Sequence, residues 1–106
     1  MKESQIHKAV VKHWEVLGKP GTLIATIPNM HAFGQAGLTK GLPDLIIIGP
    51  QLHGYLELKT ETGKLTRPQR EFQALCEANG IPFYVTHGRD EPIQLLEELG
   101  IVRSAT

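Results

Sequence analysis

The sequence has little cysteine, no net charge and no long apolar run. Its single cysteine, Cys76, cannot form an internal disulfide, and its place in a helical pattern predicts a buried apolar side chain. No apolar stretch approaches the roughly 18 residues that a membrane helix requires. Eleven basic and eleven acidic residues balance, so the basic excess of many nucleic-acid binders is absent. This argues only weakly against nucleic acid, because a protein that gathers divalent cations carries carboxylates that cancel a basic patch.

The length and the first residues indicate one domain and no export. A chain of 106 residues is close to the size at which one hydrophobic core sustains itself, so we expect a single domain over residues 1–106. Residues 1–8 are too polar for the apolar centre of a signal peptide. We therefore expect a cytoplasmic protein without a membrane span.

Apolar periodicity predicts elements in the order α-β-β-β-α-β-α. The first helix spans residues 3–17 and is closed by Gly18. A second helix opens at Thr66 with a capping pattern and ends at Asn79-Gly80, and a third, capped by Asp90, ends at Gly100. The apolar stripes predicted for the first two helices are Ile6, Val10, Val11, Trp14 and Leu17, and then Phe72, Leu75, Cys76 and Ala78.

Four branched or apolar runs predict strands at residues 22–27, 44–49, 54–59 and 81–86. The run "DLIIIG" is continuously apolar, which is typical of a strand covered on both faces. The turn 49–54 is short, so we expect the second and third strands to pair antiparallel. Residues 29–42 form a long glycine-containing loop, and such loops are more often functional or mobile than idle.

Charged residues occur in the two most apolar strands. Side chains alternate along a strand, so Glu57 and Lys59 share one face, together with Tyr55. Asp44 lies where its strand leaves the loop, and twist in the hairpin brings its carboxylate towards Glu57. Two nearby carboxylates repel each other, and a divalent cation is the natural neutraliser.

The oxygen ligands Asp44, Glu57 and the carbonyl of Leu58 favour Mg²⁺ or Mn²⁺ over zinc. The five histidines are scattered, which disfavours a zinc site. Lys59 would lie beside the cation, where its ammonium can orient a water or stabilise charge on a phosphate. This constellation suits phosphodiester hydrolysis, although Glu57 and Lys59 alone also fit a solvent-facing pair.

Basic residues near the second helix suit phosphate contact without base reading, so we expect recognition of DNA backbone and shape. A run of charges on a helix is usually only a solvated face. His31 and His87 could also reach DNA, but histidines in loops are usually solvated as well. The predicted DNA-binding residues are Lys40, Lys64, Arg67 and Arg70.

The pattern Pro43-Asp44 with Glu57-Leu58-Lys59 resembles the signature of the PD-(D/E)XK nucleases. The flanking "GLPDL", "LELKTETGKLTRPQ" and "GIPFYV" resemble the small phage-type VRR-Nuc branch, from Glu3 to about residue 85. The resemblance implies an α/β fold with a restriction-endonuclease-like αβββαβ core, a mixed central sheet and flanking helices.

By this resemblance the chain is a metal-dependent endonuclease with Asp44 and Glu57 as metal ligands and Lys59 assisting the attacking water. Gln69 matches a glutamine at the active site, although it equally fits a capping box with Thr66. Glu3 resembles an acidic residue of the first helix, with Gln5 and His7 as rivals. The resemblance also implies homodimers that act on branched DNA such as four-way junctions or flaps, in a bacterial or phage-infected cell.

Two other functions stay open at this point. The first is a non-catalytic DNA-binding or assembly module with the same fold, against which the intact Asp44, Glu57 and Lys59 argue. The second is a metal-dependent hydrolase of nucleotides or small phosphate esters. No phosphate-cradling glycine motif precedes a helix, which disfavours this second alternative.

Overall fold

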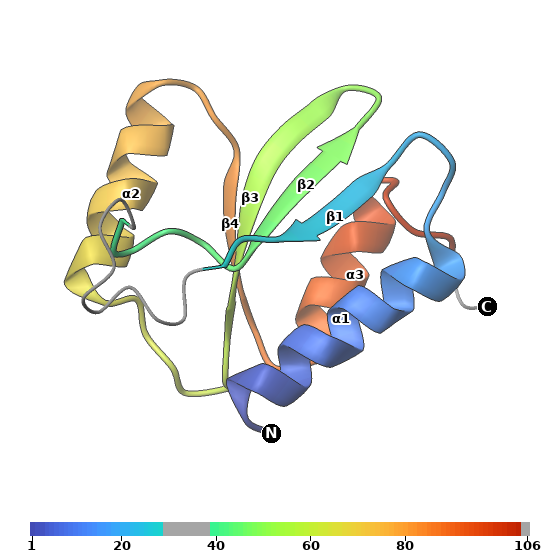
Figure 1. Cartoon of the computed structure of the whole chain (residues 1–106), viewed down its shortest axis with the longest axis horizontal. Coiled ribbons are helices and arrows are strands. Elements are labelled where there is room, and N and C mark those ends of the chain that lie inside the picture. Colours follow the sequence, from blue (N-terminus) through green and yellow to red (C-terminus); the bar gives the residue numbers. More distant parts are fainter. Residues whose placement is uncertain (29–38, 105–106) are drawn as a thin grey trace.

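A four-stranded mixed sheet forms the centre of the part of the chain that the computed structural model describes, residues 1–28 and 39–104 (Figure 1). The strand order is β1-β2-β3-β4, with antiparallel pairing between the first three strands and parallel pairing between β3 and β4. The strands are β1 (Leu23–Thr26), β2 (Leu45–Gly49), β3 (Leu52–Lys59) and β4 (Phe83–His87). The predicted element order, fold class and antiparallel hairpin are confirmed.

Helices cover the two faces of this sheet (Figure 1). The helices α1 (Glu3–Leu17) and α3 (Asp90–Glu98) lie together on one face, and α2 (Arg67–Ala78) lies on the other. Among the described residues, no helix combines the length and apolar character needed to cross a membrane. The sheet is thus the middle of three layers.

The main core lies between the sheet and the layer of α1 and α3. The predicted stripe of α1 is confirmed, with Ile6 and Val10 fully buried and its other members packed around them. Alternate residues of the strands meet this stripe because successive side chains point to opposite faces. The buried strand residues are Ile24, Leu45, Ile47, Leu56 and Leu58.

The α2 layer covers less of the sheet than the sequence predicted. Phe72 packs edge-on against Tyr55, with ring centroids 5.3 Å apart, and also contacts Phe83, so α2 rests on β3 and β4. The prediction that "DLIIIG" is covered on both faces is wrong, because Ile48 on the α2 side is 38% exposed. Buried contacts are confined to one narrow edge of α2, which leaves Leu75 59% exposed.

Three further local predictions differ from the structure. Ala78 is exposed, so it also lies outside the inner stripe of α2. The hairpin turn is tighter than residues 49–54, because β3 already begins at Leu52. Asp90 does not cap α3: Arg89 is the N-cap residue, and its guanidinium Nε lies 3.2 Å from the Asp90 carboxylate. Within the predicted loop 29–42, residues 29–38, which include His31, lie outside the described residues.

Candidate active site

Asp44 and Glu57 face each other at the end of the β2–β3 hairpin. Leu45 lies opposite Leu56, so continuing the antiparallel register by one residue places Asp44 opposite Glu57. Residues directly opposite in an antiparallel pair project from the same face of the sheet. The predicted approach of these two carboxylates is therefore a consequence of register, with Pro43 fully buried just before the strand.

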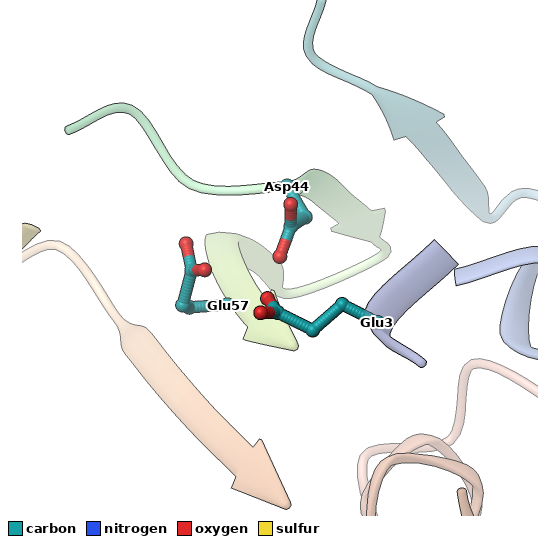
Figure 2. Close-up of side chains that lie close together, drawn as sticks. All are labelled: Glu3, Asp44 and Glu57. Carbon is teal, nitrogen blue, oxygen red and sulfur yellow. The ribbon is translucent and has the colours of Figure 1, made fainter. Parts of the chain in front are cut away.

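Glu3 adds a third carboxylate from the first turn of α1. One carboxylate oxygen each from Glu3, Asp44 and Glu57 lie within 4.8 Å of one another. Figure 2 shows the three side chains converging from α1, from the segment before β2 and from β3. Residues far apart in the sequence thus form one acidic cluster, which we call the carboxylate cluster.

The structure separates Glu3 from its two rivals in the first helix. The side-chain oxygen of Gln5 accepts the backbone N–H of Lys2 at 2.9 Å, so Gln5 caps the start of α1. The Nε2 atom of His7 lies 3.0 Å from the hydroxyl oxygen of Thr26, at the end of β1. Of these three residues, only Glu3 belongs to the carboxylate cluster.

Glu57 is the most constrained member of the cluster, with only 2% of the residue exposed. Burial raises the pKa of its carboxyl to about 8, and the negative charges of Asp44 and Glu3 act in the same direction. Lys59 opposes them by favouring the ionised form. A buried carboxyl with this pKa holds a proton at neutral pH unless another cation takes the proton's place.

The two oxygens of Glu57 have different surroundings. Oε2 accepts a hydrogen bond from the side-chain amide of Gln69 at 3.2 Å and lies 3.7 Å from the ammonium of Lys59. Oε1 is buried and has no hydrogen-bond partner among the described residues when the carboxyl is ionised. A buried oxygen without a partner is costly unless a ligand completes it. Oε1 is therefore the atom of Glu57 that suits a bound cation.

Asp44 also orients the backbone of β3. Its Oδ2 atom accepts the N–H of Leu58 at 2.8 Å, beyond the point where β2 ends. In a strand the N–H and C=O of one residue point to the same side, so the Leu58 carbonyl is directed towards Asp44 as well. This direction suits the predicted metal-ligand role of the Leu58 carbonyl.

Gln69 has a structural and a site contact at once. Its backbone N–H donates to the hydroxyl of Thr66, while its side-chain oxygen accepts the Thr66 N–H at 2.8 Å, which completes the predicted capping box. The amide nitrogen of the same side chain reaches Glu57. The first turn of α2 is thereby fixed to the carboxylate cluster.

The residues present fit a hard divalent cation. All the side-chain ligands are carboxylate oxygens that lie within 4.8 Å of one another, and the buried Oε1 of Glu57 has no hydrogen-bond partner among the described residues. Oxygen-only donor sets favour Mg²⁺ or Mn²⁺. Glu3, Asp44 and Glu57 would hold such a cation, with the Leu58 carbonyl as a further ligand.

The predicted DNA-contacting residues are exposed, and Arg67 and Arg70 also contact other groups of the protein. The Nε atom of Arg67 pairs with the Glu71 carboxylate at 3.1 Å on an exposed helix face. Arg70 donates to the carbonyl of Leu65 at 2.8 Å and so holds the segment before α2. The remaining two members, which are also exposed, are Lys40 and Lys64.

Two contacts near the site were not predicted. Gly41, with φ +85°, lies so close to Pro68 that a Cβ added to it would be 2.5 Å from the Pro68 carbonyl carbon. His87 lies opposite Lys59 in the β3–β4 register, and its ring contacts Gly63. Neither contact has a sequence signature, because each joins segments that meet only after the sheet has formed.

Comparisons with known proteins agree with this geometry. The sequence pattern of the VRR-NUC domain matches residues 1–90. A solved structure described as "VRR_NUC domain" is 23% identical, with a TM-score of 0.67, over 90% of this chain and 94% of that chain. Another, described as "VRR_NUC domain protein", is 21% identical, with a TM-score of 0.75, over 92% and 87%. At these identities the likeness shows a shared fold. No curated protein matched the chain.

Proposed function

This chain belongs to the VRR-NUC family of nuclease-type domains, and we propose that it is a metal-dependent endonuclease that hydrolyses DNA phosphodiester bonds. One observation carries the proposal: a buried, uncompensated carboxylate oxygen of Glu57 lies in a cluster with Asp44 and Glu3, next to the ammonium of Lys59. Carboxylates gathered beside a lysine suit the attack of water on a phosphate.

Each side chain of the site has a separate role in this proposal. Glu3, Asp44 and Glu57 would hold Mg²⁺ or Mn²⁺. When bound, this cation would polarise the scissile phosphate and lower the pKa of water. Lys59, only 5% exposed, orients the attacking water and offsets the negative charge that develops on the phosphate. Gln69 holds Glu57 in place through its amide.

We place the DNA along the surface between the lead-in to β2 and the start of α2. Lys40, Lys64, Arg67 and Arg70 are exposed there and suit contacts to phosphates. Because Arg67 is paired with Glu71, DNA would compete with that carboxylate for the guanidinium. Such contacts recognise backbone and shape, so we propose selectivity for branched DNA such as four-way junctions or flaps.

The proposal includes a single domain over residues 1–106 that acts as a homodimer in the cytoplasm of a bacterial or phage-infected cell. A chain of 106 residues is small for contacting both arms of a junction, whereas a two-fold dimer presents two sites. Light scattering at working concentrations tests the dimer, and a monomer throughout would contradict it.

The first experiment measures cleavage of labelled duplex, flap and four-way-junction DNA with Mg²⁺, Mn²⁺ or EDTA. The wild type is compared with Asp44→Asn and Lys59→Met, and Lys8→Met on the exposed side of α1 is the matched control. We expect metal-dependent cleavage that both site substitutions abolish and the control retains. Binding of junctions without cleavage would instead favour a non-catalytic module, and hydrolysis of free nucleotides alone would favour a small phosphoesterase.

A further inference from the structure

The end of β4 joins two other segments of the chain through His87. The backbone N–H of His87 donates to the Glu91 carboxylate in the first turn of α3, at 3.1 Å. Its ring Nε2 atom lies 3.0 Å from the carbonyl oxygen of Gly63, in the connection between β3 and α2. A carbonyl oxygen only accepts hydrogen bonds, so Nε2 carries a proton and donates it to Gly63.

The segment that His87 contacts connects two residues of the proposed site. Residues 60–66 leave β3 directly after Lys59 and enter α2 at Thr66, three positions before Gln69. The Gly63 N–H donates to the Thr60 carbonyl at 3.2 Å, so residues 60–63 form a closed turn. We call residues 60–66 the β3–α2 loop.

Backbone and side-chain hydrogen bonds fix the loop at both ends. At its start, the Gly88 N–H donates to the Lys59 carbonyl at 2.9 Å. At its end, Arg70 donates to the Leu65 carbonyl, and Gln69 caps Thr66. Between these ends, the ring of His87 contacts the Gly63 carbonyl and so ties the closed turn to the end of β4.

His87 also lies on the same face of the sheet as the site. The parallel register places it opposite Lys59, four pairs beyond Tyr55 and Phe83, so its side chain projects on the α2 side like those of Glu57 and Lys59. Its side chain is 38% exposed, less than that of Glu91 at 58%. A ring held in this place supports the loop on the face that carries Glu57 and Lys59.

We propose that His87 is a positioning residue, which holds the β3–α2 loop so that Lys59 and Gln69 keep their places around Glu57. The inference rests on the proposed nuclease function, because a cleavage rate is one of its readouts. A misplacement of about 1 Å at the reacting groups can slow an enzyme about a hundredfold, so a lost loop contact has a measurable effect.

Two substitutions separate the hydrogen bond from the bulk of the ring. Glutamine places its amide nitrogen close to the position of Nε2 and can still donate to Gly63, whereas asparagine is too short to do so. His53→Asn is the matched control, because His53 is an exposed histidine on the same face of β3 at the far end from Lys59. Metal-stimulated, single-turnover cleavage of junction DNA is measured for all variants, together with DNA affinity and hydrogen exchange at the Gly63 amide.

We expect His87→Asn to slow the cleavage step about tenfold or more with little change in DNA affinity, and His87→Gln to recover most of the rate. The Gly63 amide should exchange faster in His87→Asn than in the wild type, His87→Gln or His53→Asn. Equal cleavage rates and equal Gly63 exchange in all variants would overturn the inference. So would a glutamine variant as slow as the asparagine variant, because the donor to Gly63 would then be irrelevant.

The readouts also separate this inference from the proposed function. If the wild type cleaves no DNA, the proposed function fails, and faster Gly63 exchange in His87→Asn alone still supports the hold on the loop. If the wild type cleaves DNA and His87→Asn cleaves it equally fast, the function stands and the positioning role is wrong.

Discussion

The backbone N–H of Leu58 donates to Asp44 Oδ2 at 2.8 Å, at the place where β2 no longer supplies a partner for β3. One carboxylate therefore completes the hairpin ladder and belongs to the carboxylate cluster. A polar backbone group at the end of a sheet needs such a partner. The stability of the hairpin end and the proposed chemistry consequently depend on the same side chain.

Substitutions of Asp44 should separate these two roles. Asp44→Asn keeps an oxygen that accepts the Leu58 N–H but loses a cation ligand, whereas Asp44→Ala loses both. We expect both variants to lose cleavage, and only Asp44→Ala to lose stability, by about 1–3 kcal/mol. Urea unfolding without metal checks the stability. Equal stabilities of the alanine and asparagine variants would show that the bond to Leu58 contributes nothing.

The raised pKa of Glu57 predicts that the metal-free protein loses stability as the pH rises. The carboxyl titrates near 4.5 in the unfolded chain and near 8 in the folded one, so between these values the folded state binds the extra proton. Stability falls with pH wherever the folded state binds more protons than the unfolded state. We therefore expect the free energy of unfolding to fall between about pH 4.5 and pH 8 and then to level off.

Urea unfolding across this pH range, in EDTA, measures the effect. Glu57→Gln should flatten the dependence, because a neutral amide does not titrate, while Glu15→Gln at an exposed position of α1 should leave the slope unchanged. Adding Mg²⁺ should restore stability to the wild type at high pH. A wild type and Glu57→Gln variant with parallel pH profiles would show that Glu57 does not titrate in this window.

The sequence predicted the elements and the approach of Asp44 to Glu57 because both follow from local periodicity and register. Strand alternation alone places Glu57 and Lys59 on one face, and the short turn makes β2 and β3 antiparallel. The apolar pattern of a helix does not tell how far that helix extends over a sheet. The prediction that Leu75 is buried was therefore wrong. The sequence pattern also could not choose among Glu3, Gln5 and His7 in the first helix. That choice depends on how α1 lies against the end of the sheet, where Glu3 meets Asp44 and Glu57.

Gln69 should contribute separately to helix capping and to the site. Thr66→Ala removes the side-chain cap of α2 but leaves the Gln69 amide facing Glu57, and we expect a loss of about 1 kcal/mol with cleavage retained. Gln69→Glu keeps an oxygen for the Thr66 N–H but replaces the donor to Glu57 by a negative charge. We expect near-wild-type stability in the presence of metal and cleavage slowed about 10–100-fold. Thermal unfolding and single-turnover cleavage check both, and similar cleavage losses in the two variants would contradict a separate site role.

Gly41 should tolerate no side chain, because it has two constraints. Its φ of +85° disfavours other residues, and a Cβ would lie 2.5 Å from the Pro68 carbonyl oxygen. Gly21 has a similar φ of +79° with nothing within 4 Å, so Gly21→Ala measures the backbone cost alone. We expect Gly21→Ala to cost about 1 kcal/mol and Gly41→Ala clearly more.

Gly41 should also differ from Gly21 in its effect on metal binding. The contact with Pro68 fixes the lead-in to Asp44 against the first turn of α2, which carries Gln69. Gly41→Ala should therefore weaken Mn²⁺ binding, measured by calorimetry below the unfolding temperature, while Gly21→Ala should leave it unchanged. Equal Mn²⁺ affinities in the two variants would show that the approach of Gly41 to Pro68 matters for stability only.

Lys59 lowers the pKa of Glu57 and, in the proposed function, also assists the attacking water. Measurements at two pH values should separate these two effects. Lys59→Met should raise the pKa of Glu57 further, so a cation has to displace a more tightly held proton and Mn²⁺ binding weakens at neutral pH. At about pH 9 or above, where Glu57 is ionised more fully, the Mn²⁺ affinity of the variant should approach that of the wild type. Cleavage by Lys59→Met should stay at least about a hundredfold slower there, because the ammonium that stabilises the transition state is missing. Cleavage that recovers together with Mn²⁺ binding would mean that Lys59 acts only by adjusting Glu57.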